Sequence, residues 1–396
     1  MKKILLFSLL FCSYCFASDE SKILSPAQQT EIIETLQNKL TTHYILADKA
    51  QETKELLEEL KQSTTIQKPT DKKSFAQYLQ QQVQMILNDK HFRVIVPRPR
   101  NTSSETDILK QHLNALTNFR KGGFQDIQML EGNVGYVKID GFRGEETHQV
   151  DGLMIYLRTA DAIIIDLRDN RGGARPVNYL TSYFLPEGTL VGSTYHRFKD
   201  SWQNHFVDKI KGDKRLDVPL FILTSDRTFS AAEAFTYNLQ ARQRAIVVGE
   251  VTGGGAHPIQ FFELPEGLAT IVPNRRSHNP VTDTNWEGTG VKPDINVDEE
   301  LALNEAKALA KTAAEQYRST TITELSNLLN PENVDKTQNK ADLEQKAQRL
   351  IEILLQRKHL ESFMLAGFAR RYRALGNDFA AEQFESVDKR LNETEY

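Results

Sequence analysis

Cysteine, tryptophan and long hydrophobic runs are scarce in this chain of 396 residues. It has two cysteines, both near the N-terminus, and two tryptophans. No apolar run beyond the first residues reaches the roughly 20 positions that a membrane-spanning helix needs. The formal net charge of −4 gives no basic balance of the kind that binds nucleic acid. The nine histidines are scattered and no His-Glu-x-x-His motif occurs, so neither a metal nor another cofactor is indicated.

The first 17 residues have the layout of a secretory signal peptide. Lys2 and Lys3 form a short positive region, an apolar stretch follows, and Ala17 precedes polar residues. Cleavage after Ala17 would remove both cysteines, so the mature chain would have no disulfide and no thiol nucleophile. We therefore expect a periplasmic or secreted protein with no integral membrane segment after cleavage. A buried N-terminal strand or an uncleaved anchor is the alternative interpretation.

The remaining pattern divides the chain into four parts. Apolar residues at helical spacing predict a small helical bundle over residues 18–96. Residues 97–124 begin with a stretch rich in Pro, Arg, Asn and Ser, which predicts a linker. A core follows at 125–300, and residues 301–396 are rich in helix-forming residues. We interpret this last part as an accessory helical region that could pack on the core, form a homo-oligomer or dock a partner.

Within the core, the pattern predicts strands alternating with helices. Strand-like segments are expected at 134–142, 162–167, 219–224, 245–248 and 268–272, the last as a candidate antiparallel strand. Helical patterns lie between the first four, at 146–157, 176–185 and 231–240. This alternation predicts an α/β core with a mostly parallel sheet and right-handed crossovers.

Two loops of this predicted core carry residues suited to chemistry. Asp166 to Gly173 follows a buried strand, and its paired glycines Gly172 and Gly173 permit positive φ and close approach of a ligand. The second loop ends at Ser230, where a helix begins, so unbonded N–H groups there favour a developing anion. Both loops lie at carboxyl ends of parallel strands, the edge where open α/β sheets place their sites. By itself, however, Ser230 with Glu233 also matches a capping box.

A third stretch adds an imidazole and a carboxylate. Residues 249–258 contain three consecutive glycines followed by His257, and Glu287 lies in a later loop that also carries glycines. The glycine run again permits unusual backbone conformation and close approach. Ser225 and Thr228 are further hydroxyls near Ser230, and we interpret them as turn-forming residues.

Together, five ordered motifs resemble the tail-specific, or C-terminal processing, serine protease superfamily. They are Gly-Asn-Val-Gly-Tyr at 132–136, Asp-Leu-Arg-Asp-Asn-Arg-Gly-Gly at 166–173, Thr-Phe-Ser-Ala-Ala-Glu at 228–233, Gly-Glu-Val-Thr-Gly-Gly-Gly-Ala-His-Pro at 249–258, and Gly-Thr-Gly-Val-Lys-Pro-Asp at 288–294. The match is similar to the branch of interphotoreceptor retinoid-binding protein modules and the tricorn core protease, and it covers about residues 25–300. It implies a ClpP/crotonase-like core. The last hundred residues are not explained by it.

Two departures from the superfamily pattern change the expected chemistry. Only about 35 residues separate His91 from the start of the predicted core at residue 125, too few for the PDZ domain of many relatives. The lysine of the Ser–Lys dyad is also absent, because Gly255 occupies its position. The tricorn-like alternative implies a triad of Ser230, His91 and Glu287 instead. A serine nucleophile needs a base and the base needs an orienting acceptor, so this set is chemically coherent.

These residues predict an exported serine-type endopeptidase that hydrolyses peptide bonds of a peptide or protein substrate through an acyl-enzyme on Ser230. His257 is the alternative base, since on a strand it would face the same side as Gly255. Gly172 or Gly173, with the Ala231 N–H, would form the oxyanion hole. The alternative functions are a non-catalytic carrier of hydrophobic ligands, of retinoid or fatty-acid type, and an interaction scaffold built on the C-terminal helices.

Overall fold

The computed structural model describes residues 20–64, 66, 68–97, 109, 123–143, 147–173, 176–330, 340–357 and 359–394. The chain forms two compact units. The first, here called the N-terminal unit, combines residues up to 113 with the later segments 194–203 and 257–278; the second, the core unit, holds the rest. The predicted signal peptide and most of the predicted linker at 97–124 lie outside the described residues.

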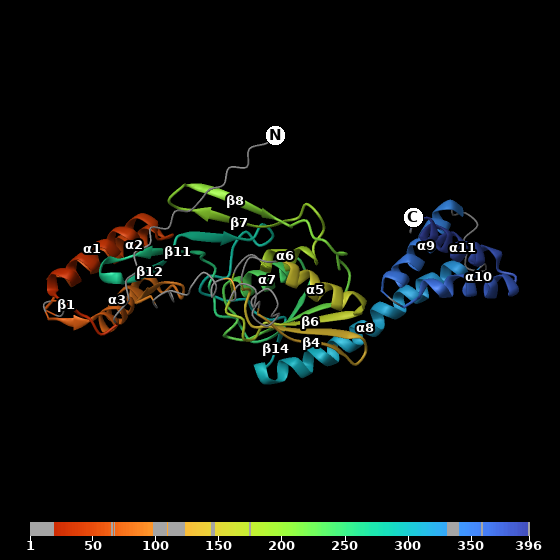
Figure 1. Cartoon of the computed structure of the whole chain (residues 1–396), viewed down its shortest axis with the longest axis horizontal. Helices are drawn as coiled ribbons and strands as arrows, with labels where there is room; N and C mark the ends of the chain where they lie inside the picture. The colour runs from red at the N-terminus through yellow and green to blue at the C-terminus, as the bar shows by residue number, and fades with distance from the viewer. Residues whose placement is uncertain are drawn as a thin grey trace. The chain divides into compact units, whose positions relative to one another are not determined.

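Three amphipathic helices build the N-terminal unit: α1 (Pro26–His43), α2 (Ala47–Gln62) and α3 (Lys72–Leu87) (Figure 1). The sequence starts α1 cleanly, because Ser25 and Gln28 form a capping box and Pro26 occupies the first turn. Two short strands, β1 (Ile23–Leu24) and β2 (Thr70–Asp71), pair antiparallel beside the helices. The buried faces of the helices share one hydrophobic cluster, in which Leu36, Leu57 and Leu79 are fully buried.

A three-stranded antiparallel sheet completes this unit. Its order is β11 (Ile259–Glu263), β12 (Ala269–Pro273) and β3 (Arg93–Ile95), with the 3₁₀ turn η3 (Pro265–Gly267) joining the first two. Both outer strands run antiparallel to β12, so they run in the same direction as each other. The further strand predicted at 268–272 is therefore present and is antiparallel, the orientation considered for it; it lies in this sheet and not in the core sheet.

The core unit is built on a six-stranded sheet. The order is β14 (Ile295–Asn296), β10 (Ile246–Gly249), β9 (Leu220–Thr224), β6 (Ala162–Asp166), β5 (Val134–Ile139) and β4 (Phe124–Leu130). Every neighbouring pair is parallel except β4 with β5. The prediction of an α/β core with a mostly parallel sheet is confirmed. As expected, β6 and β9 are buried along their whole length, because helices cover both faces.

The two faces of the sheet divide the helices between them. On one face, Ile163 and Ile165 pack with α5 (His148–Tyr156), the turn η2 (Leu157–Thr159), α6 (Pro176–Ser182) and α7 (Ala231–Gln240). On the other face, Ala162 and Ile164 pack against α8 (Glu299–Leu329) (Figure 1). Alanines at four-residue spacing form the contact ridge of α8, and their small size lets the helix approach closely: Ala302, Ala306, Ala310 and Ala314.

A further sheet and a helical bundle complete the described chain. The hairpin of β7 (Leu190–His196) and β8 (Ser201–Phe206) pairs through β7 with β13 (Arg275–His278). After α8 come α9 (Lys340–Gln356), the turn η5 (Ser362–Met364), α10 (Leu365–Ala374) and α11 (Asp378–Thr394), which enclose their own apolar cluster with the end of α8. Within the described residues, no helix is both long and apolar enough to cross a membrane.

A buried carboxylate holds the C-terminal helices against the core. Asp161, directly before β6, is fully buried and accepts hydrogen bonds from Arg318 on α8 at 2.6 and 2.9 Å and from Asn133 at 2.9 Å. Its second oxygen lies 2.6 Å from His359 Nε2, which follows α9. Burial acts to raise the pKa of Asp161, but the bonds from His359, Asn133 and Arg318 outweigh it and hold the pKa below its usual value.

We expect Asp161→Asn to destabilise the protein at neutral pH by on the order of 3 kcal/mol, because it removes the fully buried carboxylate that binds Arg318 and His359. The folded-state pKa is lowered, so the stabilisation is complete above about pH 4 and is lost as the pH falls through the folded value. Thermal unfolding of both proteins between pH 3 and pH 7 measures this. The control Glu131→Gln breaks an exposed pair with Lys311 and should change little. A difference that persists unchanged at pH 3 would contradict the assignment.

Candidate active site

Three loops meet at the carboxyl ends of β6, β9 and β10. They are residues 167–173, here called the glycine loop, residues 225–230, the serine loop, and residues 250–256, the triple-glycine loop. Because these strands are adjacent and parallel, their loops fall at one edge of the sheet. Direct bonds join the loops: the Phe229 N–H donates to the Asn170 carbonyl at 2.9 Å, and the Gly253 N–H donates to the Thr228 carbonyl at 2.9 Å. The predicted placement of the glycine and serine loops at one edge of the sheet is confirmed, whereas the position of the triple-glycine loop beside them was not predicted.

Ser230 occupies a strained turn where the serine loop enters α7. Its backbone has φ 56° and ψ −116°, a region that L-residues rarely adopt. An ordinary helix-capping serine is extended, as Ser25 is with φ −71° and ψ 161°. Such strain costs on the order of 1–3 kcal/mol and persists only where the surroundings enforce it. The backbone of Ser230 therefore differs from that of an ordinary helix-capping serine, which its sequence context alone could not show.

The glycine loop lies directly against Ser230. Gly172 has φ 97°, and a methyl group placed on it would come within 2.8 Å of Ser230 Cβ and 2.9 Å of the Ala231 nitrogen. Gly173 has φ 146°, and a methyl group there would lie 1.8 Å from the Phe142 carbonyl oxygen. Both positions therefore require glycine. The Gly172 N–H donates to Asn170 Oδ1 at 2.8 Å, so this donor is already used within the loop.

Ser225 and Thr228 shape the serine loop. Both are fully buried. The Thr228 hydroxyl donates to the Leu167 carbonyl at 2.8 Å and accepts the Ser225 N–H at 3.0 Å, while the Ser225 hydroxyl donates to the Arg168 carbonyl at 2.6 Å. These bonds fasten the serine loop to the glycine loop. Their interpretation as turn-forming residues is confirmed.

Glu233, in the first turn of α7, connects Ser230 to the triple-glycine loop. Its side chain is fully buried. One carboxylate oxygen accepts the Ser230 N–H at 2.7 Å and the Gly255 N–H at 2.9 Å, and the other accepts the Gly254 N–H at 2.6 Å and the Thr252 hydroxyl at 2.5 Å. Burial raises the pKa of Glu233, and these four donors act in the opposite direction by stabilising the ionised form. The predicted hydrogen bond from the Ser230 N–H to Glu233 is present, but the bonds from the triple-glycine loop to Glu233 were not predicted.

Glu287, predicted as the orienting carboxylate, lies in the core unit beside the triple-glycine loop. Its Oε2 accepts the Ala256 N–H at 2.5 Å, and its own N–H donates to Asn285 Oδ1 at 2.9 Å. The neighbouring Gly288 N–H donates to the Gly254 carbonyl at 3.0 Å, and Trp286 Nε1 donates to the Gly255 carbonyl at 2.9 Å. Glu287 thus fixes the backbone that directly precedes His257.

The two candidate bases, His91 and His257, both belong to the N-terminal unit. His91 precedes β3 and His257 precedes β11; these strands run in the same direction, so both histidines lie at the same end of their sheet. The turn to His91 is set locally, because Asn88 ends α3 in the left-handed conformation with φ 47°.

Asp89 lies between the two histidines. It is 2 % exposed and accepts the His91 backbone N–H at 2.9 Å and the Tyr44 hydroxyl at 3.3 Å. His257 Nδ1 lies 2.9 Å from Asp89 Oδ2, whereas His91 Nδ1 lies 3.9 Å from Asp89 Oδ1. Asp89 therefore gives His257 the carboxylate contact that fixes an imidazole ring and its tautomer. Burial lowers the pKa of His91 to about 4, against the opposing charge of Asp89.

The comparison with protein families agrees with this geometry. Residues 133–297 match Peptidase family S41, and residues 22–121 match the N-terminal domain of Peptidase S41 in eukaryotic IRBP. The chain belongs to peptidase family S41. The S41 match includes the serine, glycine and triple-glycine loops and Glu287, and the N-terminal match includes Asp89 and His91. Neither match includes α9, α10 or α11.

Curated relatives of this S41 chain are processing proteases. It is 31% identical over 172 residues to the carboxyl-terminal-processing protease of Synechocystis sp., covering 43% of this chain and 39% of the relative. It is 30% identical over 165 residues to the chloroplastic carboxyl-terminal-processing peptidase 2 of Arabidopsis thaliana, covering 41% and 31%. The aligned segments thus span less than half of these relatives.

Among solved structures, similar chains share the fold. A putative peptidase from Parabacteroides merdae superposes with a TM-score of 0.53 at 18% identity, covering 72% of this chain and 97% of that one. A lipoprotein from Streptococcus agalactiae gives a TM-score of 0.50 at 16% identity, covering 73% and 98%. Identities this low show a shared fold and carry no residue roles.

Sequence reasoning missed two features of the site. Asp89 was not predicted as a site residue, because nothing in the order of residues brings it to His257, which lies 168 positions away. The strain at Ser230 also leaves no mark in the sequence, since Ser-x-x-Glu is common at relaxed helix starts.

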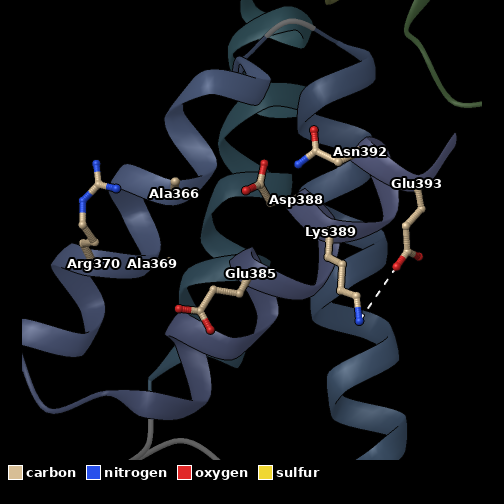
Figure 2. A pocket seen from close by; sticks show the side chains of 8 residues that line it. All are labelled: Ala366, Ala369, Arg370, Glu385, Asp388, Lys389, Asn392 and Glu393. Atoms are coloured by element: carbon tan, nitrogen blue, oxygen red, sulfur yellow. Dashed lines mark ion pairs between the residues drawn. The ribbon is translucent and has the colours of Figure 1, made fainter. Parts of the chain in front are cut away.

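A separate hollow of about 470 Å³ lies in the C-terminal bundle, between α10 and α11. Figure 2 shows it lined by charged and polar side chains of both helices, with Lys389 paired to Glu393 at 3.8 Å. Its lining contains none of the predicted site residues.

Glu233→Gln tests the connection between Ser230 and the triple-glycine loop. The substitution replaces one acceptor oxygen by an amide NH₂ group that faces two N–H or O–H donors, so the loops should separate. We expect the rate of fluorophosphonate labelling to fall by about 10²-fold, the effect of small displacements of reacting groups. The control Asp226→Asn removes the same charge from an exposed side chain of the serine loop. Equal labelling rates in Glu233→Gln and the wild type would refute the positioning role.

Proposed function

We propose that this S41 chain is a serine-type endopeptidase that hydrolyses peptide bonds through an acyl-enzyme on Ser230. The observation that carries the proposal is the strained Ser230 turn, held between the glycine loop and the triple-glycine loop. A relaxed capping serine needs neither a positive φ nor two glycine loops fastened to it. Membership of a peptidase family and the processing proteases among its relatives support the same reaction class.

The proposed oxyanion hole is formed by backbone N–H groups beside Ser230. Ala231 is the first residue of α7, so its N–H has no acceptor within the helix and the helix dipole favours an anion there. Gly173 is the proposed second donor, because the N–H of Gly172 already binds Asn170 Oδ1. Two donors aimed at the developing oxyanion each contribute about 10²–10³ in rate.

The proposed base is His91, with Glu287 as the carboxylate that orients it. The resemblance to tricorn-like proteases supports this pair. His257 is the alternative, and a specific contact favours it: its Nδ1 is 2.9 Å from Asp89 Oδ2, the geometry of an oriented catalytic imidazole.

The reaction then follows the serine peptidase sequence. The imidazole takes the proton of the Ser230 hydroxyl as its oxygen attacks the peptide carbonyl carbon, and the N–H groups of Gly173 and Ala231 stabilise the tetrahedral anion. The imidazolium returns the proton to the leaving amine as the C–N bond breaks, which leaves an ester on Ser230. Water, deprotonated by the same imidazole, hydrolyses the ester and restores the serine.

Ser230→Ala tests the nucleophile. We expect complete loss of labelling by a fluorophosphonate probe and a fall in peptide hydrolysis of at least about 10³-fold, because covalent catalysis is removed. Ser201→Ala, at an exposed strand position, is the control and should label normally. Labelling that persists in Ser230→Ala would sink the assignment. A wild type that ignores both probe and peptides but co-purifies with fatty acid would instead support the carrier function.

His91→Ala and His257→Ala distinguish the two bases. Loss of the base should lower kcat by about 10²–10⁴-fold, while loss of the other histidine should have a smaller effect. The pH profile adds a second criterion. A base must be neutral to accept a proton, and the pKa of His91 is about 4, so with His91 as base the activity should rise through pH 4 and be flat above pH 6. An acid limb centred near pH 6.5 would exclude His91 as the base.

A further inference from the structure

Glu299 contacts all three loops of the candidate site although it lies outside the segment that matches the S41 family, which ends at residue 297. It is the first residue of α8. Its carboxylate receives two hydrogen bonds from Arg227 of the serine loop, at 3.0 and 2.5 Å. Its carbonyl accepts from Arg168 of the glycine loop at 2.6 Å, and its N–H donates to Glu250 of the triple-glycine loop at 3.2 Å.

The two arginines that contact Glu299 also bind other residues in or next to the loops that flank Ser230. Arg227, three residues before Ser230, also donates to Asp169 of the glycine loop at 2.9 and 3.1 Å. Arg168 forms a two-point bond with the buried carboxylate of Asp166, at 2.9 and 2.7 Å. Paired bonds of this kind fix orientation as well as distance.

The helix behind Glu299 cannot move freely, because its alanine ridge is packed against the core sheet. Ala302, one turn after Glu299, is fully buried there. The position of Glu299 is therefore set by the sheet, and the position of Arg227 is set by Glu299. The pair itself is partly exposed, with 27% for Glu299 and 36% for Arg227, so it contributes little to the free energy of unfolding. The pair is therefore better suited to fixing the position of Arg227 than to stabilising the folded protein.

We propose that Glu299 is a positioning residue for the nucleophile. Through Arg227 and Arg168 it anchors the loops around Ser230 to α8, so that α8 sets the geometry of the site. This inference rests on the proposed serine-peptidase function. It assigns to the start of α8 a role in the reaction, in addition to covering the sheet.

Glu299→Gln, Arg227→Lys and the double variant test the proposal. We expect the rate constant for fluorophosphonate labelling of Ser230 to fall about tenfold in each single variant, since small displacements of reacting groups are costly. The double variant should be no slower than the singles, because both changes break the same contact. The midpoint of thermal unfolding should stay within about 2 °C of the wild type, because a partly exposed pair adds little stability.

Lys311→Ala is the matched control, because it breaks another ion pair of α8, with Glu131, away from the three loops. It should leave the labelling rate unchanged. Raising the salt concentration from 0.1 to 1 M should slow the wild type towards the rate of Glu299→Gln and leave that variant nearly unaffected, since partly exposed charges are screened. Labelling of Glu299→Gln within twofold of the wild type, or an equal loss in Lys311→Ala, would overturn the proposal.

Hydrogen exchange separates this inference from the proposed function. The Phe229 N–H bonds the glycine loop and the Gly253 N–H bonds the serine loop, so both report loop order without any reaction. They should exchange faster in Glu299→Gln than in the wild type and Lys311→Ala. If the wild type does not label, the proposed function fails while this comparison still decides the anchoring role. If the wild type labels but exchange at both amides is unchanged, the anchoring role fails alone.

Discussion

The buried carboxylate of Glu233 is the interaction on which the candidate site depends. It compensates for the positive φ of Ser230 by binding its N–H, and the same two oxygens hold the triple-glycine loop in place. A buried carboxylate without donors would be costly, and two glycine N–H groups in an unsupported loop would bind water instead. The four donors and the Glu233 carboxylate therefore stabilise each other, and these hydrogen bonds maintain the strained backbone of Ser230.

Around this centre the core unit uses each loop for a different purpose. The glycine loop brings its backbone close to Ser230 at Gly172, a position where only a glycine fits. The serine loop buries Ser225 and Thr228 as fasteners, and Glu287 fixes the backbone before His257. The N-terminal unit contributes a different polar cluster, in which Asp89 contacts both His91 and His257. Chemistry-bearing residues thus sit on loops whose ends are fixed by buried strands.

The sequence predicted the core well because buried parallel strands and amphipathic helices have different periods. The sequence was less informative where the hydrophobic period does not distinguish between alternative arrangements of a strand or helix. Residues 269–273 form the further strand that the sequence predicted, but its partners in the N-terminal unit were not predicted, because a hydrophobic pattern does not identify a partner strand. The sequence predicted a helical region at 301–396 but not the bounds of its members, such as α8, which continues to Leu329, and α11. Both belong to the C-terminal bundle, whose helices are stabilised by packing against one another.

By itself the sequence determined the fold class and the family, and it proposed Ser230, the paired glycines and two histidines as candidate site residues, because motif order and strand–loop–helix alternation are local properties. The tertiary structure decided what surrounds them. It placed Asp89 against His257 rather than in equal contact with both histidines, gave Ser230 a backbone that no local signal specifies, and joined Glu299 to three loops. These are contacts between positions up to 168 residues apart, and they form only when packing of the strands and helices brings their ends together.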